Sequence, residues 1–215
     1  MVLQDMQNLL GAIYDVPIAH RVDDFLLTDR TQLPPGALQA DEQLLVSAGD
    51  DALRVGLFVD PAVLARLRNS DPADLLHSGN LGDFLTAIEG VSHFHYLTFH
   101  ARYDRAVSPL ELELQAEIDK YVACLWLMRR QCPDRFPAEL RAQLFSDSFR
   151  IDPRLGRTER ALYEQATVQA ERYCRAFERR VRQAHPRPLE ECAAGLRRFY
   201  RWSFNRKLAH IRELH

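Results

Sequence analysis

Hydrophobic side chains recur at helical spacing over most of the chain. Between Thr158 and Ala184 the apolar positions advance by three or four residues at a time, which predicts one long amphipathic helix. Similar stripes predict helices over residues 1–13, 83–103 and 108–128, and a last helix close to the C-terminus. The C-terminal part of the chain is therefore expected to form a bundle of about four long helices.

The region before residue 60 instead contains strand-like segments. Residues 42–48 and 52–59 flank the turn sequence Gly49-Asp50-Asp51 and predict a β-hairpin, and residues 25–28 resemble a further strand. The expected fold is α+β and predominantly helical, with a small N-terminal antiparallel sheet ahead of the helical bundle. We expect two parts, a small acidic α/β subdomain over residues 1–79 and the bundle over residues 80–215.

Two short helices are expected directly after the hairpin. Asp60-Pro61 and Asp71-Pro72 each place a capping side chain before a proline, which is favoured at the first position of a helix. Both sites therefore predict a helix start.

Charge is distributed unevenly along the chain, although the net charge is only −2. Residues 1–128 hold 8 Lys and Arg against 19 Asp and Glu, whereas residues 129–215 hold 20 against 11. Opposite charges on the two parts, together with an alanine-rich helix face, predict association through helix faces. The partner would be a second copy, giving a homodimer, or another protein.

Targeting and cofactor signals are missing from the sequence. The N-terminal residues do not resemble a signal peptide, and the longest apolar run, residues 121–128, is far too short to cross a bilayer. A cytoplasmic protein without a membrane partner is therefore expected. Glycine-rich nucleotide-binding motifs are also absent, so no cofactor is expected.

One group of polar residues has the spacing of a metal site. Glu89, His93 and His100 share one helical face, and Glu113 and Glu117 on the next predicted helix could add carboxylates if the helices packed antiparallel. Di-metal bundles use two Glu-x-x-His pairs, and this chain has neither. The preferred interpretation is therefore a polar stripe with no metal, and His95, on the apolar face, is expected to be a core histidine.

A second group is basic and lies in the C-terminal helices. Arginine forks bind phosphates and aromatic rings stack on unpaired bases, so such residues could contact single-stranded RNA. The alternatives are a solvated surface and a surface that faces acidic residues of this chain or of a partner. The candidates are Arg172, Arg175, Arg179, Arg182, Arg197, Arg198, Arg201 and Trp202.

Two short runs, residues 180–185 and 205–210, distantly resemble the Arg-x4-6-His element of HEPN ribonucleases. The resemblance implies a helical dimer that cuts RNA without a metal. The second run departs from the pattern, because Asn205 occupies the expected arginine position and Arg206 is only four residues before His210.

The sequence alone does not decide whether the protein is an enzyme. The preferred hypothesis is a non-catalytic interaction or regulatory protein. An RNA-binding or RNA-cleaving protein that uses the basic helices is the alternative, and a metal-dependent helical-bundle enzyme is the third hypothesis.

Overall fold

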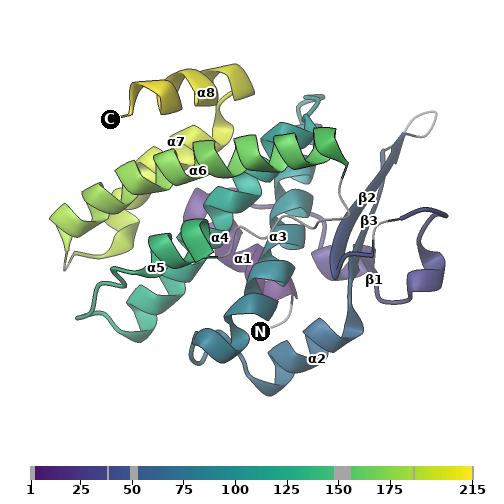
Figure 1. The fold of residues 1–215 in the computed structure, drawn as a ribbon, viewed down its shortest axis with the longest axis horizontal. Coiled ribbons are helices and arrows are strands. Elements are labelled where there is room, and N and C mark those ends of the chain that lie inside the picture. The colour runs from purple at the N-terminus through teal and green to yellow at the C-terminus, as the bar shows by residue number, and fades with distance from the viewer. Residues whose placement is uncertain (1–2, 38, 49–52, 148–155, 186, 215) are drawn as a thin grey trace. The chain divides into compact units, whose positions relative to one another are not determined.

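The computed structural model describes the chain except for residues 1–2, 38, 49–52, 148–155, 186 and 215. The described residues form a predominantly helical α+β fold with eight α-helices and one three-stranded sheet, as the sequence predicts (Figure 1). Contacts divide them into two compact units. The first unit comprises residues 1–12 and 16–106, and the second comprises residues 13–15 and 107–215. The division expected after residue 79 stays a prediction.

The first unit begins with helix α1, Leu3–Tyr14, whose last residues belong to the second unit. Its sheet contains β1, Leu26–Leu27, β2, Glu42–Ala48, and β3, Leu53–Val59, in the order β1-β3-β2. The antiparallel pairing of β2 with β3 confirms the predicted hairpin, whose turn lies outside the described residues. The strand expected near residue 26 also forms, but it pairs in parallel with β3, so the sheet is mixed and not purely antiparallel as expected.

Two helices complete the first unit. Helix α2, Pro61–Asn69, starts as predicted, with Asp60 Oδ1 accepting a hydrogen bond from the Ala62 amide at 2.9 Å. Helix α3, Ser78–Ala101, packs against α2, β2 and β3. Fully buried side chains such as Phe58 and Phe84 form the core of this unit.

The helix predicted at Asp71-Pro72 is wrong. Asp71 does accept a hydrogen bond from the Ala73 amide at 2.8 Å, but only a turn follows. The Asn80 amide closes this turn by donating to the carbonyls of Ser70 and Leu75. The turn and the connection to α3 occupy all the residues between Asp71 and Ser78, so too few remain for a separate helix.

The second unit is built around two long helices. Helix α4, Pro109–Gln131, and helix α6, Arg157–Ala184, confirm the helices predicted over residues 108–128 and 158–184, and they pack along each other. Buried Ala166 and Ala170 let the backbone of α6 approach its neighbour closely. Between them lie α5, Leu140–Ala142, and a π-helical turn over Gln143–Asp147.

The predicted last helix is interrupted. Helix α7, Ala193–Arg201, and helix α8, Phe204–Glu213, are separated by extended backbone at Trp202, with ψ 154°, and Ser203, with ψ 153°. The change of direction lets Lys207 of α8 point into the core, where it is fully buried. None of the helices in the described segments has the length and apolar character needed to cross a membrane.

Candidate metal centre

Three potential metal ligands converge within the first unit. One oxygen each of Glu42 and Glu89 and one ring nitrogen of His93 all lie within 4.8 Å of one another. Glu42 is the first residue of β2, whereas Glu89 and His93 lie one turn apart on α3. His93 is buried and the two glutamates are partly exposed. We call these three residues the Glu–His cluster.

A glycine in α3 makes this convergence sterically possible. A side chain at Gly90 would collide with Glu42 Oε2, and its Cβ would lie only 2.7 Å from Leu57 Cδ1. Glycine in the interior of a helix costs about 1 kcal/mol relative to alanine. At this position the missing side chain leaves room for the Glu42 carboxylate beside the backbone of α3.

The spacing of the cluster suits one small cation. Ligand atoms bound to a common ion at about 2.1 Å lie roughly 3.0 to 4.2 Å apart in tetrahedral or octahedral geometry. The observed separations, all within 4.8 Å, therefore need to shrink by at most about 2 Å. Two carboxylates this close also repel each other, and a cation between them would remove that repulsion.

The other residues of the predicted polar group lie elsewhere. His100 is two turns beyond His93 on α3, about 10 Å along the helix, and both of its ring nitrogens lie 2.9 Å from Arg105 Nη1. Glu113 and Glu117 belong to α4 in the second unit, where Glu117 pairs with Lys120 at 2.7 Å. The cluster therefore contains two predicted residues, and Glu42 is an addition.

His95 is a core residue, as expected. Its side chain is fully buried, and burial is the main cause that lowers the pKa of His95 to about 4, against a smaller opposing effect of its hydrogen bond to the Val16 backbone. The imidazole is therefore neutral at physiological pH.

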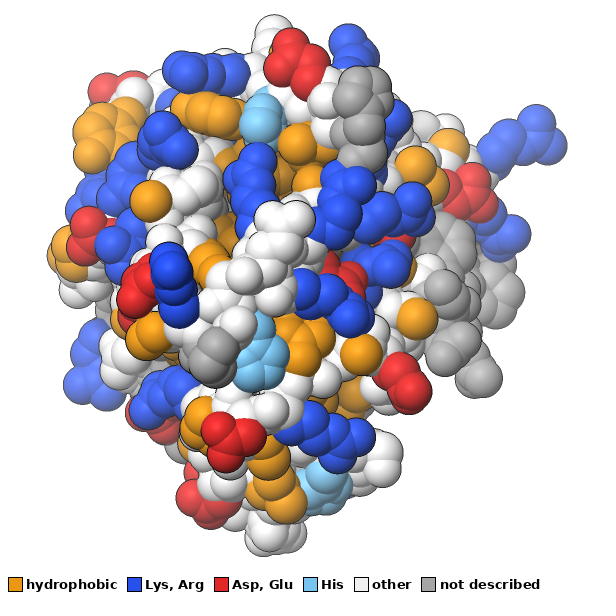
Figure 2. All heavy atoms as spheres, turned by 90° about the vertical axis from the view of Figure 1, so that its left-hand side faces the viewer, with side chains coloured by type: hydrophobic (Ala, Val, Ile, Leu, Met, Phe, Trp, Pro, Cys, Tyr) orange, Lys and Arg blue, Asp and Glu red, His pale blue; other side chains and the backbone are white. Residues whose placement is uncertain are grey.

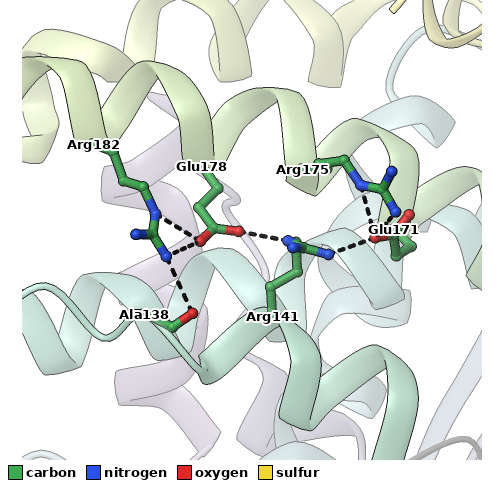
Figure 3. Close-up of polar contacts among 6 residues, drawn as sticks. All are labelled: Ala138, Arg141, Glu171, Arg175, Glu178 and Arg182. Atoms are coloured by element: carbon green, nitrogen blue, oxygen red, sulfur yellow. Dashed lines mark hydrogen bonds and ion pairs between the residues drawn. The ribbon is translucent and has the colours of Figure 1, made fainter. Parts of the chain in front are cut away.

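Two arginines of the predicted basic faces form ion pairs with glutamates of the second unit. Figure 3 shows Arg141 of α5 between two glutamates of α6, Glu171 and Glu178. Arg175 pairs with Glu171 at 2.8 Å and Arg182 with Glu178 at 2.6 Å, each pair being four residues apart on α6. These two predicted arginines thus belong to an internal ion-pair network.

Other predicted arginines bind main-chain oxygens. Arg197 donates to the Ile13 carbonyl at 3.1 Å, and Arg201 donates to the Tyr14 carbonyl at 3.0 Å. Both carbonyls are at the C-terminal end of a helix, where carbonyl groups lack helical partners. These two arginines therefore act as caps.

The remaining candidates are at the surface of the second unit. Arg172 donates to the Leu214 carbonyl at 3.1 Å, Arg179 and Arg198 are exposed, and Trp202 is partly buried. Figure 2 shows one face of the molecule on which Lys and Arg side chains gather, with acidic and hydrophobic side chains among them. Basic side chains therefore gather on one face of the molecule. Several of the predicted arginines, however, are already bound to glutamates or to main-chain carbonyls.

The second unit also contains a polar group that the sequence did not reveal. Lys207 Nζ donates to Gln115 Oε1 at 2.6 Å, Gln115 Nε2 donates to Asp119 Oδ1 at 2.7 Å, and the Tyr14 hydroxyl donates to the same carboxylate oxygen. All four side chains are at most 1% exposed. We call them the buried network. Because donors meet acceptors throughout, its geometry is that of a core stabilising element.

Searches against protein families, curated proteins and solved structures find no match to this chain. The geometry of its own residues is therefore the basis for assigning a function.

Proposed function

We propose that the chain is a metal-dependent protein that binds one divalent transition-metal ion through Glu42, Glu89 and His93. The observation that carries the proposal is the convergence of three ligand atoms of suitable type within 4.8 Å. The ligands come from two elements, a strand and a helix, so helical periodicity alone does not explain their convergence.

The donor set favours particular metals. One imidazole nitrogen with two carboxylate oxygens suits zinc, manganese or ferrous iron, whereas calcium and magnesium prefer oxygen ligands only. The first unit as a whole is acidic, with 7 Lys and Arg against 14 Asp and Glu, which attracts cations.

Three protein ligands also leave coordination positions for water or a substrate, as in catalytic rather than structural zinc sites. Zinc held by these residues would lower the pKa of a bound water to about 7 and so supply a nucleophile. Metal-assisted hydrolysis is therefore the reaction class that this arrangement would serve. The third hypothesis from the sequence, a metal-dependent enzyme, thus becomes the leading one.

Other expectations from the sequence stay predictions. They are a role in protein interaction, a homodimer, RNA binding by the basic helices and a cytoplasmic location.

Calorimetric titration of metal-free protein with Zn²⁺ and Mn²⁺ tests the proposal. We expect saturable binding of one ion per chain. Glu42→Gln, Glu89→Gln and His93→Gln should each weaken it by about tenfold or more, since ligands matter at least as much as their outer-shell partners. Matched controls are His20→Gln and Asp24→Asn, which change exposed side chains of the same unit.

Two results would overturn the metal site. One is a wild-type chain that binds neither ion at a single site. The other is a loss of affinity in the control variants that equals the loss in the cluster variants. In either case the three residues of the Glu–His cluster would interact with one another within the fold and would not bind a metal.

A further inference from the structure

Strand β2 lies at an edge of the sheet and pairs with β3 on one side. The Asp60 amide donates to the Asp41 carbonyl at 2.8 Å, so these two residues are a hydrogen-bonded pair of the antiparallel ladder. Hydrogen-bonded and non-hydrogen-bonded pairs alternate along such a ladder, which gives Leu45 its hydrogen bonds to β3. The N–H and C=O groups of Leu44 and Val46 therefore point away from β3, toward the open edge.

The sequence of β2 lacks the residues that guard sheet edges against further pairing. Proteins protect an edge strand with proline, with lysine or with a β-bulge. Residues 43–47 contain no proline and no charged side chain, and the pairing with β3 runs without a bulge from Glu42 to Ala48. Within the ranges that the structure describes, no hydrogen bond reaches the outward groups of Leu44 or Val46. The edge can therefore accept another strand.

Helix α3 covers one side of the hairpin at one end. A Cβ at Gly90 of α3 would meet the side chains of Glu42 and Leu57, so α3 lies on the side of the sheet to which these two residues project. Val46 and Leu53 project to the same side, because side chains alternate along a strand, yet they are 47% and 46% exposed. The far ends of β2 and β3 extend away from α3 (Figure 1). We call Val46 and Leu53 the exposed patch.

A second copy of β2 fits the open edge when it pairs antiparallel about a two-fold axis at Leu45. All seven residues of β2 are then paired, which favours this register over a shifted one. Leu44 faces Val46 of the second copy, and their outward groups form a hydrogen-bonded pair. Glu42 faces Ala48 of the second copy, so no like charges are opposed.

The same pairing covers the exposed patch of each copy. Because the two strands run antiparallel, the Glu42 end of the second copy's β2 lies beside the far end of the first copy's hairpin. Helix α3 of the second copy packs over that Glu42 end, so it comes to lie beside Val46 and Leu53 of the first copy. The two-fold axis makes this burial reciprocal. An unrelated extended peptide would pair with the edge but would bring no helix to the exposed patch.

We propose that the chain forms a two-fold symmetric dimer in which the β2 strands pair antiparallel and join the two sheets into one. This interface differs from the alanine-rich face of α6 that the sequence suggested, because Ala166 and Ala170 of that face are buried. It uses the backbone of β2 and the exposed patch, so it does not depend on whether Glu42 binds a metal.

Light scattering over about 1 to 200 µM protein tests the dimer, a range that covers weak and transient interfaces. The mass should rise from 24.8 kDa toward about twice that value as the concentration increases. Val46→Pro removes an outward N–H that β3 does not use, and should weaken association at least about tenfold because each copy loses a hydrogen bond. Val46→Ile keeps this N–H and should associate as wild type does. A wild-type chain that stays monomeric throughout, or Val46→Pro that associates as strongly as wild type, overturns the proposal.

Proline also restricts the backbone of β2, so a second pair of variants leaves the backbone unchanged. Val46→Glu places a charge in the exposed patch, which the second copy's α3 would cover, and should weaken association at least about tenfold. Ser47→Glu, at the next exposed position, projects to the other side of the sheet and should change association by less than about threefold. Equal effects of the two variants would contradict the proposed pairing.

Amide hydrogen exchange locates the interface within the strand. The outward amides of Leu44 and Val46 should exchange rapidly in dilute protein and at least about tenfold more slowly in the dimer. The amide of Leu45, which is bonded to β3, should exchange slowly at both concentrations. A dimer that leaves the Leu44 and Val46 amides unprotected uses another surface and also overturns the proposal.

Discussion

The Glu–His cluster of the first unit and the buried network of the second unit are built in different ways. The buried network of the second unit alternates donors and acceptors, from the Lys207 ammonium through the Gln115 amide to the Asp119 carboxylate and the Tyr14 hydroxyl. The Glu–His cluster of the first unit instead brings together two carboxylates and an imidazole, with both glutamates partly exposed.

The comparison separates stabilising chemistry from binding chemistry. A fully buried network is stable only when each polar group meets its complement, because a buried group that loses its partner is costly. A cluster of like-charged groups near the surface gains little stability by itself, but it concentrates ligand atoms for a cation. We therefore expect mutations in the buried network to affect folding and mutations in the Glu–His cluster to affect metal affinity.

The largest expected effect is loss of stability in Lys207→Met. The substitution keeps most of the volume but removes the ammonium from its buried partners, which should cost about 3 to 5 kcal/mol in the free energy of unfolding. Urea unfolding can be followed by the fluorescence of Trp126 and Trp202, both of which lie in the second unit. Arg212→Met, at an exposed position of α8, should change the free energy by less than about 0.5 kcal/mol. A loss below about 1 kcal/mol for Lys207→Met would contradict the stabilising role.

Metal binding should produce the next largest effect, and it should be confined to the first unit. At 100 times the dissociation constant, an ion that binds only the folded state adds about 2.7 kcal/mol. Hydrogen exchange of α3 amides should slow on addition of Zn²⁺ or Mn²⁺, while the tryptophan-detected unfolding of the second unit stays unchanged. Glu89→Gln, which should bind the ion at least tenfold more weakly, should reduce this added stability to about 1.4 kcal/mol or less at the same ion concentration. Slowing of α3 exchange that is as large in Glu89→Gln as in wild type would exclude the Glu–His cluster as its source.

A smaller loss is expected from Tyr14→Phe. The variant keeps the ring that stacks on Tyr200 at 4.2 Å but removes one donor to the Asp119 carboxylate, which should cost about 1 to 3 kcal/mol by the same tryptophan-detected unfolding. Tyr200→Phe, which retains the Tyr14 hydroxyl, serves for comparison. Equal stability of wild type and Tyr14→Phe would show that the hydroxyl contributes nothing.

The same tyrosine makes stability depend on alkaline pH. Burial, followed by the charge of Asp119, raises the pKa of Tyr14 well above its ordinary value, so the phenol stays protonated in the folded state. The unfolded chain releases this proton above about pH 10. The contribution is therefore present below pH 10 and is lost as pH rises further, and the advantage of wild type over Tyr14→Phe should shrink there.

Periodicity predicted the long helices well because it reflects one-sided burial within a segment. The stripe from Thr158 to Ala184 matches α6 to within one residue. The start of α3 was missed because its cap is unusual. His77, rather than Ser, Thr or Asp, accepts the hydrogen bond from the Gly79 amide at 3.0 Å.

The candidate metal site was only partly predictable, because periodicity shows which residues of one segment share a face but not which segments pack together. Glu89 and His93 are one turn apart on a helix, so their shared face follows from spacing. Glu42 comes from a strand nearly 50 positions earlier, and only tertiary packing brings it to α3. The glutamates that pair with two of the arginines were easier to predict from the sequence. Glu171 and Glu178 lie four residues before Arg175 and Arg182, which is the spacing of helical ion pairs.

The smallest effects on stability should come from alanine substitutions at two glycines of α3. These variants test whether the close approach of Glu42 to α3 matters for metal binding or only for packing. Gly82→Ala meets no atom within 4 Å and should stabilise the helix by up to about 1 kcal/mol. Gly90→Ala gains the same helix propensity, but the new methyl displaces Glu42 and Leu57, which should offset the gain and leave a net cost near 1 kcal/mol. Metal titration separates the two further, because Gly90→Ala should lower the affinity for Zn²⁺ about tenfold, as expected for loss of a supporting contact, while Gly82→Ala leaves it unchanged. If both variants bind the ion as wild type does, the close approach of Glu42 to α3 is a packing feature and Glu42 does not ligate the metal.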